Sequence, residues 1–395
     1  MNEKKTIFLD NASTTVMRRE TLEAMEPYFL EDYGNPSSIH SMGRTPRDAC
    51  NKARQTLASI IGAHPDEIYF TSGGTESDNW VLNSAARMSG KGKNIVISKI
   101  EHHAMIETAE ALEKEGYEIR YAGVDEFGTI DFKGLEKLVD NDTALVSVMT
   151  ANNEIGTIEP IMKISKIAHE HGALFHTDAV QAICHIPIDV NDMGIDLLSA
   201  SGHKFGGPKG IGFLYIRKGI RIQPFLRGGA QEEGKRAGTT NVPGIVGMAK
   251  AAELSMDDLQ SKIVKVSELR DHAIERIEKE IPYCRLNGHR TERLPGNVNF
   301  SFRFVEGESL LMMMNHNGIC VSTGSACASG SLDPSHVLLA IGLPHEIAHG
   351  SIRMSLSEDN TIEEIDKAVD VLKSSVERLR SLSPLYEDYL KKGGE

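Results

Sequence analysis

Short apolar segments alternate with helix-length segments through the first 200 residues, and this alternation restricts the possible folds more than any other feature. The apolar runs predict buried strands, and the segments between them repeat apolar residues at a spacing of three to four, which predicts helices. Strands that are apolar throughout and separated by helices form βαβ units, in which helices cover both faces of a mainly parallel sheet. The sequence therefore predicts an α/β fold, with strands at 68–70, 94–98, 118–121, 144–149, 173–177 and 196–200.

The pattern changes after about residue 240. A long helix is expected over 244–280, with Ser255 as a candidate break, followed by a strand at 296–302 and a last helix that starts at the capping-box sequence Asn360–Glu363. A chain of 395 residues also exceeds the usual size of one core. We therefore predict a large domain over 15–255, and a smaller α+β domain formed by 1–14 and 256–395.

Charge and composition exclude several classes of protein. The net charge of −13 disfavours general nucleic-acid binding, and no apolar run approaches the roughly 20 residues of a membrane-spanning helix. The N-terminus lacks the apolar core of a signal peptide. The scattered cysteines include no CxxC pair, so a disulfide framework and a cysteine-based metal site are not expected, and no other metal-ligand spacing is found. These features predict a cytoplasmic protein without a membrane segment. The cysteines are Cys50, Cys184, Cys284, Cys320 and Cys327.

Lys204 lies between the end of a predicted strand and a glycine-rich turn, in the sequence Ser201-Gly202-His203-Lys204-Phe205-Gly206-Gly207. A lysine in this setting is open on one side and supported on the other, which suits Schiff-base chemistry with a carbonyl. The alternative is a surface hairpin with a solvated lysine, because loops collect glycine for turn geometry alone.

Two further motifs follow predicted strands. Gly73-Gly74-Thr75 lies between a strand and a helix, so its backbone N–H groups and the Thr75 hydroxyl can hold a phosphate, or can simply start the helix. Asp178 ends the strand 173–177, where ligands bind in parallel sheets. It could keep a pyridine nitrogen protonated, or could cap a helix.

Three more residue types are candidates for catalysis or binding. His102 or His103 could transfer protons, or could cap the following helix. Cys327 lies in a segment of glycine, serine, alanine and threonine, where a thiol is either reactive or incidental. Arg353, in a short alternating strand, could clamp a carboxylate or form an ordinary ion pair.

Taken together, these motifs resemble the pyridoxal-phosphate-dependent cysteine desulfurases of the NifS/IscS type, the group with a long cysteine loop, in the class V aminotransferase family. The resemblance extends from about residue 7 to 357 and implies a fold-type I pyridoxal-phosphate enzyme. The motifs are Thr71-Ser72-Gly73-Gly74-Thr75-Glu76-Ser77, Glu101-His102-His103, Asn152-Asn153-Glu154-Ile155-Gly156, His176-Thr177-Asp178-Ala179-Val180-Gln181, Ser201-Gly202-His203-Lys204 and Gly324-Ser325-Ala326-Cys327.

The resemblance assigns a role to each candidate residue. Lys204 would carry the cofactor as a Schiff base, and Asp178 would pair with the pyridine nitrogen. The phosphate would be held by Gly74, Thr75, Ser201 and His203, and by Thr239 of the neighbouring subunit, which implies a homodimer. Gln181 would contact the ring hydroxyl, His102 would stack on the ring, and Asn153 and Arg353 would bind the substrate carboxylate.

The same resemblance implies that L-cysteine is converted to L-alanine. Lys204 would remove the Cα proton, Cys327 would attack the substrate sulfur to form a persulfide, and His102 would shuttle protons. A NifU- or IscU-like iron–sulfur scaffold is the expected sulfur acceptor, although tRNA thiolation is an open alternative.

Other activities of the same fold remain open from the sequence. Transamination has no use for Cys327, whereas a selenocysteine lyase could share it, and a non-catalytic sulfur carrier would not need Lys204. One departure from the family pattern is the pair Cys184-His185, because the family usually has glycine and often lysine after the glutamine. We interpret this pair as a tolerated substitution, with a second thiol near the cofactor as the alternative.

Overall fold

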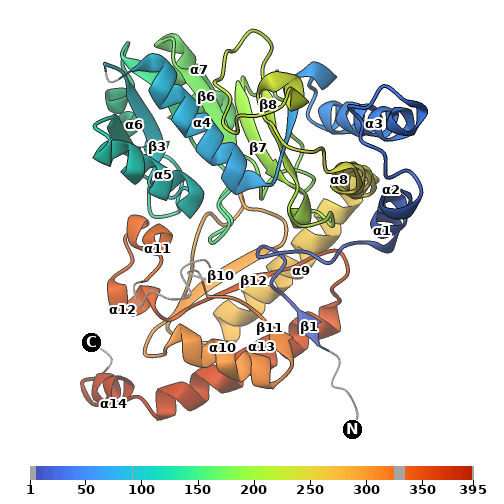
Figure 1. Cartoon of the computed structure of the whole chain (residues 1–395). Helices are drawn as coiled ribbons and strands as arrows, with labels where there is room; N and C mark the ends of the chain where they lie inside the picture. The colour runs from blue at the N-terminus through green and yellow to red at the C-terminus, as the bar shows by residue number, and fades with distance from the viewer. Residues whose placement is uncertain (1–5, 91, 324–333, 394–395) are drawn as a thin grey trace.

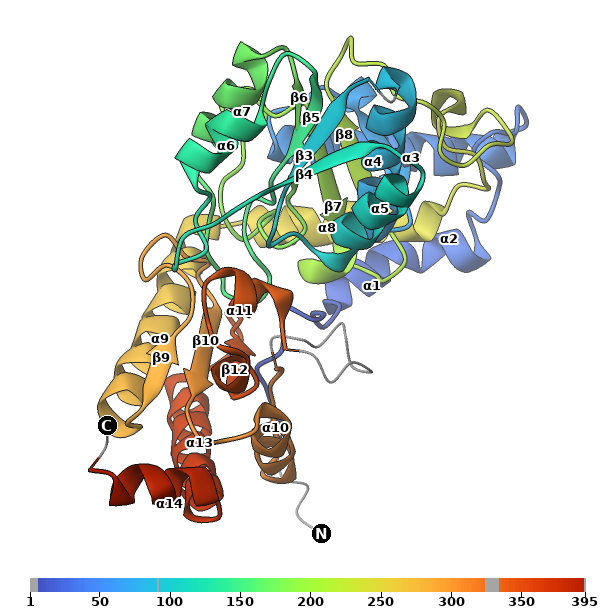
Figure 2. The ribbon, with the colours of Figure 1, turned by 90° about the vertical axis from the view of Figure 1, so that its left-hand side faces the viewer.

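A large α/β part and a smaller part beneath it make up the molecule (Figure 1). The computed structural model describes residues 6–90, 92–323 and 334–393. A view turned by 90° also shows the smaller part below the large sheet (Figure 2).

The large part is built on a seven-stranded sheet with the order β2-β8-β7-β6-β5-β3-β4. Only β8 is antiparallel to its neighbours β2 and β7, so the other six strands run in one direction. The predicted mainly parallel sheet is confirmed. The strands are β2 (Ile68–Thr71), β3 (Asn94–Ser98), β4 (Glu118–Ala122), β5 (Thr143–Ser147), β6 (Leu174–Asp178), β7 (Leu197–Ser201) and β8 (Gly212–Ile216).

Both faces of this sheet are covered, because successive strand residues point to opposite sides. Phe70, Val96 and Leu198 pack in a core with α3, α6, α7 and α8, whereas Tyr69 and Ile95 pack in a second core with α4 and α5. Burial on both sides explains why these strands are apolar throughout. The helices are α3 (Arg44–Ile60), α4 (Gly74–Ser89), α5 (His103–Lys114), α6 (Phe132–Leu138), α7 (Ile161–Glu170) and α8 (Val242–Met256).

The smaller part contains an antiparallel sheet with the order β12-β10-β9, against which α9, α10 and α13 pack. The N-terminal strand β1 (Ile7–Phe8) pairs with β11 (Ile319–Cys320), and Ile7 and Leu9 belong to the same apolar core. The domain boundaries proposed from the sequence stay a prediction. The other elements are β9 (Cys284–Leu286), β10 (Asn297–Phe302), β12 (Ser351–Ser355), α9 (Leu259–Glu280), α10 (Gly307–His316) and α13 (Ile362–Ser381).

Two expectations about the C-terminal helices can be compared with the structure. The break expected near Ser255 is confirmed, since α8 ends at Met256 and α9 begins at Leu259. The helix predicted to be the last, α13, is followed by α14 (Pro384–Lys391), so that prediction was wrong. In addition, α13 is capped by Thr361, whose hydroxyl accepts from the Glu364 N–H, one position later than the sequence motif implied.

Tertiary contacts explain α14. Its residues Tyr386 and Tyr389 pack against Tyr283 and Phe304, which lie about 80 to 100 residues earlier in the chain. The remaining short helices are α1 (Arg19–Met25), α2 (Pro27–Leu30), α11 (His336–Ala340) and α12 (His345–Ala348).

Two properties of the described residues bear on function. Within 6–90, 92–323 and 334–393, no helix combines the length and apolar character needed to cross a bilayer. The same residues include no group of three or more His, Cys, Asp or Glu side chains placed to hold a metal ion.

Candidate active site

The candidate site lies at the carboxyl edge of the large sheet, where β2, β3, β6 and β7 all end. Thr71 and Ser201 both pair with Gly212 of β8, so the ends of β2 and β7 lie at the same level. A Cβ atom at Gly212 would lie 2.7 Å from the Gly73 Cα and 2.3 Å from the Ala200 carbonyl oxygen. A glycine at 212 therefore lets the turn after β2 approach the end of β7.

Lys204 ends a short 3₁₀ turn (Gly202–Lys204) directly after β7. Its Nζ donates to the carbonyl oxygens of Ala12, at 2.6 Å, and Ser13, at 2.9 Å. The Gln181 side-chain amide donates to the same Ala12 oxygen at 2.9 Å, so these two predicted cofactor residues meet at one carbonyl. Sequence reasoning missed the role of Ala12 and Ser13, because they act through main-chain oxygens that any residue would provide.

The turn at Gly73 forms a cradle for an anion. Gly73 precedes α4 and has a φ of +152°, and a Cβ there would lie 3.5 Å from the Ser201 hydroxyl. The first N–H groups of a helix lack partners within the helix and attract negative charge. The structure thus brings the predicted phosphate residues Gly74, Thr75 and Ser201 to one place.

His203 is also part of this region, but it faces the N-terminal segment. Its Nδ1 lies 3.1 Å from the Thr14 hydroxyl. Burial, followed by the nearby cations Lys204 and Lys209, lowers the pKa of His203 to about 4. His203 is therefore neutral at physiological pH, and can hold a phosphate only through a hydrogen bond.

Asp178 is the last residue of β6 and is 5% exposed. One carboxylate oxygen accepts from the Val180 N–H at 2.8 Å. The following segment is a series of turns and not a helix, so Asp178 stabilises a turn and is not a helix cap. Burial raises the pKa of Asp178 to about 6, although the Val180 hydrogen bond and Lys204 act in the opposite direction.

Two further acidic residues lie beneath the site and were not identified from the sequence. Asp78 and Glu101 are buried, and within the described part of the chain one carboxyl oxygen of each has no hydrogen-bond partner. Burial, and then the proximity of Asp178, raises the pKa of both residues well above the usual range. The charged form of Asp78 and of Glu101 is therefore disfavoured by burial and by the neighbouring Asp178 carboxylate.

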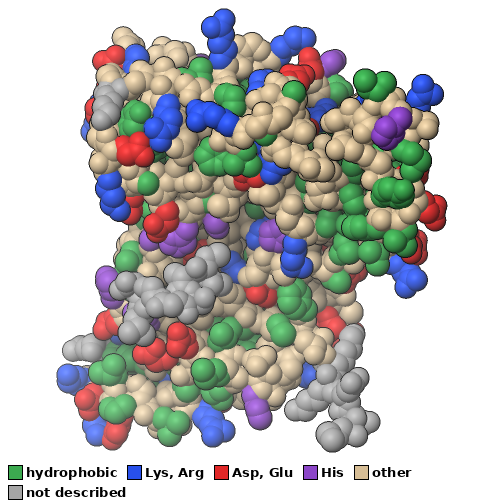
Figure 3. All heavy atoms as spheres, in the orientation of Figure 1, with side chains coloured by type: hydrophobic (Ala, Val, Ile, Leu, Met, Phe, Trp, Pro, Cys, Tyr) green, Lys and Arg blue, Asp and Glu red, His purple; other side chains and the backbone are tan. Residues whose placement is uncertain are grey.

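His102 caps α5, and its Nδ1 accepts from the Ala104 N–H at 3.1 Å. The neutral ring must therefore carry its proton on Nε2. Burial, and then repulsion from Lys204 and His103, lowers the pKa of His102 to about 4. The capping alternative is thus correct, and it leaves Nε2–H available as a donor. Figure 3 shows several histidine side chains in the hollow between the two parts of the molecule.

Arg353 lies beside Asn153, as the carboxylate-binding prediction requires. The guanidinium donates to the Asn153 carbonyl at 2.9 Å, to Asp10 at 3.0 Å and to the Ser13 hydroxyl at 2.9 Å. Its Nε is buried and has no hydrogen-bond partner among the described residues. The ion-pair alternative is therefore correct, and binding of a substrate carboxylate by Arg353 stays a prediction.

The remaining predicted residues lie at the rim or outside the described part of the chain. Thr239 is exposed, on a segment that the Arg236–Glu76 ion pair holds against α4, with N–O distances of 2.8 and 3.0 Å. Cys327 lies outside the described residues. After it, Ser335 donates to Glu154, and the ring of His336 donates to the Glu101 carbonyl at 3.0 Å.

These groups fit pyridoxal phosphate. The α4 N-terminus and Ser201 suit its phosphate, the buried Asp178 carboxylate suits a protonated pyridine nitrogen, and the Lys204 amine suits its aldehyde. Asp178 and Lys204 are also close enough for the Lys204 charge to lower the pKa of Asp178.

Comparison with known proteins agrees with this arrangement. The sequence profile of the aminotransferase class-V family matches residues 7–368. The chain is 53% identical over 384 residues to cysteine desulfurase IscS from Methanosarcina thermophila, covering 97% of this chain and 95% of that protein. A solved NifS-like protein superposes with a TM-score of 0.89 at 39% identity, covering 94% and 99%. A solved complex of SspA with cysteine has a TM-score of 0.79 at 34% identity, covering 90% and 100%.

The fold and the site define a pyridoxal-phosphate enzyme of fold type I, and the chain belongs to the aminotransferase class-V family. Within that family it is a cysteine desulfurase of the NifS/IscS type.

We predict that His102 stays neutral down to about pH 4 in the cofactor-free protein, well below the usual pKa of 6.5. The unfolded chain binds this proton near pH 6.5, so His102 lowers the stability of the fold as pH falls through this interval. NMR titration of the ring measures the pKa directly. The variant Lys204→Met should raise it without restoring 6.5, because burial remains. Titration of wild-type His102 near 6.5 would contradict the prediction.

Proposed function

We propose that Lys204 holds the cofactor and Cys327 accepts the sulfur when L-cysteine is converted to L-alanine. The observation that carries this proposal is the meeting of Lys204, Gln181 and the N-terminal segment beside Asp178. The similarity to a protein solved in complex with cysteine supports L-cysteine as the substrate.

The described residues can hold the cofactor from several sides. Gly74, Thr75 and Ser201 would bind the phosphate, with His203 as a neutral hydrogen-bonding partner. Asp178 would keep the pyridine nitrogen protonated, and Gln181 would reach the ring hydroxyl. The partly buried His102 would cover one face of the ring. Pyridoxal phosphate then supplies an electron sink for the carbon from which a proton is removed.

Substrate positioning falls to Arg353 and Asn153. Arg353 is 3% exposed, so its charge is not screened by water, and its Nε, which has no partner in the described part of the chain, would donate to the carboxylate of L-cysteine. The amine of Lys204, which contacts the carbonyl oxygens of Ala12 and Ser13, would take the Cα proton. His102, which is neutral with its proton on Nε2, would move protons for the leaving amino acid.

Cys327 completes the reaction in this proposal. Its thiolate forms an S–S bond with the sulfur of the substrate while the C–S bond of the substrate breaks. The electron pair of that bond stays with the carbon skeleton, which takes up a proton and leaves as alanine. The products are therefore alanine and a persulfide on Cys327, and no external reductant is required.

A homodimer with shared sites is the second element of the proposal. Thr239 is exposed on its own subunit, which leaves it free to reach the phosphate of a partner subunit. Large apolar side chains gather on α1, α2 and the segment after them, and Figure 3 shows them on the right of the molecule. Leu22, Phe29, Leu30 and Tyr33 are between 50% and 76% exposed, which marks a surface that a second copy can cover.

The similarity to IscS supports a proposal for the sulfur acceptor, and the cysteines support one for the compartment. An iron–sulfur scaffold protein is the acceptor we propose, with sulfur transfer toward tRNA as the competing fate. Cys50, Cys184, Cys284 and Cys320 are free thiols, which fits a reducing compartment such as the cytoplasm.

Replacing Lys204 by alanine should abolish covalent attachment of pyridoxal phosphate and lower kcat by at least about a thousandfold, since the amine both binds and transfers a proton. Borohydride reduction followed by peptide mapping identifies the attached lysine. The matched control is Lys209→Ala, an exposed lysine of the same loop, which should label as the wild type does. Cofactor fixed to another lysine in the wild-type protein would refute the assignment.

Replacing Cys327 by serine should leave cofactor binding intact but abolish sulfide release from L-cysteine with a reductant. In the wild type, mass spectrometry should find a gain of about 32 Da on the peptide that contains Cys327. The control Cys320→Ser should keep both the activity and the modified peptide. Full activity of Cys327→Ser would exclude the persulfide step and favour another class-V activity.

Mixing two inactive variants tests whether the sites are shared. Lys204→Ala and Thr239→Asp should each be inactive, the second because a carboxylate repels the phosphate. After unfolding and refolding together, mixed dimers would contain one intact site, and about a quarter of wild-type activity should return. No recovery, with dimers confirmed by light scattering, would mean that Thr239 acts within its own subunit.

A further inference from the structure

His185, which departs from the family pattern, contacts the main chain of Lys204 directly. Its Nε2 lies 2.9 Å from the carbonyl oxygen of Lys204. A carbonyl oxygen can only accept a hydrogen bond, so Nε2 must carry the proton. Burial lowers the pKa of His185 below its usual value, although its bond to Lys204 and the nearby Glu358 raise it. The ring is therefore neutral near pH 7, in the tautomer with its proton on Nε2.

The turn that carries His185 also carries Asp178. The N–H of Val180 donates to the Asp178 carboxylate, the N–H groups of Ala182 and Ile183 reach back to the Ala179 carbonyl, and the N–H of His185 donates to the Ala182 carbonyl. One hydrogen-bonded turn thus connects Asp178, the proposed partner of the pyridine nitrogen, to His185, which contacts the main chain of Lys204.

Cys184 makes this turn at a conformational cost. Its φ is +62°, a left-handed conformation that is unfavourable for a residue other than glycine. Burial raises the pKa of its thiol to about 12, so Cys184 is not a second nucleophile. The strain is located at the residue that precedes His185, where the chain reverses to present the ring to Lys204.

Hydrogen bonds from the N-terminal segment hold the backbone on both sides of Lys204. The Thr15 N–H and hydroxyl donate to the His203 carbonyl, at 3.0 and 2.9 Å, and the Gly206 N–H donates to the Thr15 hydroxyl at 2.7 Å. His185 supplies the corresponding contact at the carbonyl of Lys204 itself. Because Cα and this carbonyl both belong to Lys204, the hydrogen bond from His185 restricts the position of the Cα atom from which the lysine side chain extends.

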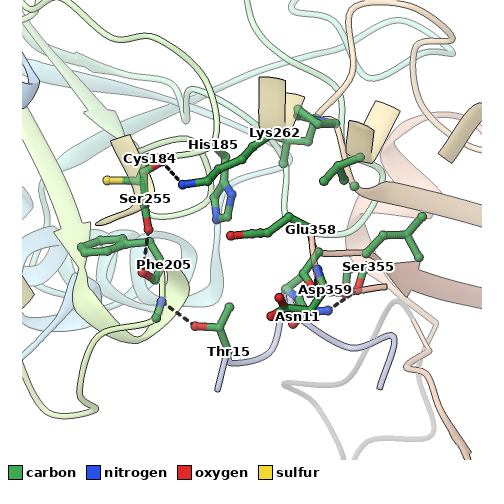
Figure 4. Close-up of a pocket in the computed structure, with 18 of the residues that line it drawn as sticks. Asn11, Thr15, Cys184, His185, Phe205, Ser255, Lys262, Ser355, Glu358 and Asp359 are labelled. Atoms are coloured by element: carbon green, nitrogen blue, oxygen red, sulfur yellow. Dashed lines mark hydrogen bonds between the residues drawn. The ribbon is translucent and has the colours of Figure 1, made fainter. Parts of the chain in front are cut away.

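The other side of the His185 ring borders a cavity of about 120 Å³ between the two parts of the molecule. Figure 4 shows Glu358 across this cavity with its carboxylate toward the ring, and Lys262 and Ser255 near Cys184. Glu358 forms an ion pair with Arg18, and its main-chain carbonyl accepts from Lys265 of α9 at 2.6 Å. His185 therefore lies between the smaller part of the molecule and the peptide of Lys204.

We propose that His185 is a positioning residue for Lys204, which it orients by donating from Nε2 to the Lys204 carbonyl. The inference rests on the proposed role of Lys204 as the cofactor lysine. It explains why a polar ring occupies a site at the edge of a cavity, and why the preceding cysteine accepts a strained conformation.

The test compares His185→Phe, which keeps a ring but loses the donor, with His185→Gln, whose amide can replace Nε2–H. The His185→Phe variant should lower kcat about tenfold with KM changed less than about twofold, because a displaced amine affects proton transfer more than binding. The pH midpoint of the absorbance of the bound cofactor should move by about half a unit or more. His185→Gln should restore kcat to within about twofold of the wild-type value, and the absorbance midpoint to within about a fifth of a pH unit.

The control is Cys184→Gly, which borders the same cavity and relieves the positive φ while His185 remains. It should keep wild-type kcat and absorbance midpoint. Wild-type behaviour of His185→Phe, or equal defects in His185→Phe and His185→Gln, would overturn the proposal. A defect in Cys184→Gly as large as in His185→Phe would show that the turn, and not the imidazole, positions Lys204.

A measurement on the wild-type protein without cofactor covers the case in which His185→Phe does not fold. With ¹⁵N-labelled histidine, NMR should report His185 as neutral with its proton on Nε2 at pH 7. A neutral ring with its proton on Nδ1 cannot donate to the carbonyl, and would overturn the proposal. Peptide mapping of the wild-type holoenzyme distinguishes failure of the positioning role from failure of the proposed function. If the cofactor is attached to Lys204 and the His185 variants behave as the wild type does, only the positioning role is rejected.

Discussion

The common direction of six strands in the large sheet is the constraint on which the rest of the structure depends. Because β2, β3, β6 and β7 end at one edge, the turn at Gly73, His102, Asp178 and Lys204 come together although they span more than 130 positions. β8 preserves this arrangement by running in the opposite direction between β2 and β7. Gly212, at the start of β8, lets the backbones on both sides approach it.

Burial then changes the pKa values of the side chains that lie together at this edge of the sheet. The pKa values of Asp78, Glu101 and Asp178 rise, those of His102 and His203 fall, and the positive charge of Lys204 opposes the rise at Asp178. In water the same residues would have ordinary pKa values. Desolvation disfavours the charged form of each buried group, which raises the pKa of the acids and lowers the pKa of the histidines.

Most of the fold could be predicted because the two kinds of element have distinct patterns. The buried strands are short runs that are apolar throughout, whereas the helices repeat apolar residues every three to four positions. The strand 94–98 has the bounds expected from the sequence, and the break between α8 and α9 lies within a few residues of Ser255. α14 was missed because it is short and is held by aromatic contacts with Tyr283 and Phe304 from a distant segment. Ala12 and Ser13 were missed because their carbonyl oxygens, and not their side chains, contact Lys204.

The sequence by itself determined the class of fold and the chemical types at the site, because apolar period and residue type are local properties of the chain. The tertiary structure decided which atom of each residue is already hydrogen-bonded and which can still bond to a ligand. It placed Nδ1 of His102 on a helix N–H, left Nε of Arg353 without a partner among the residues described, and directed the ring of His185 toward the Lys204 carbonyl. Tautomer, free donor and protonation state depend on neighbours far along the chain and on exclusion of water, and no local pattern encodes them.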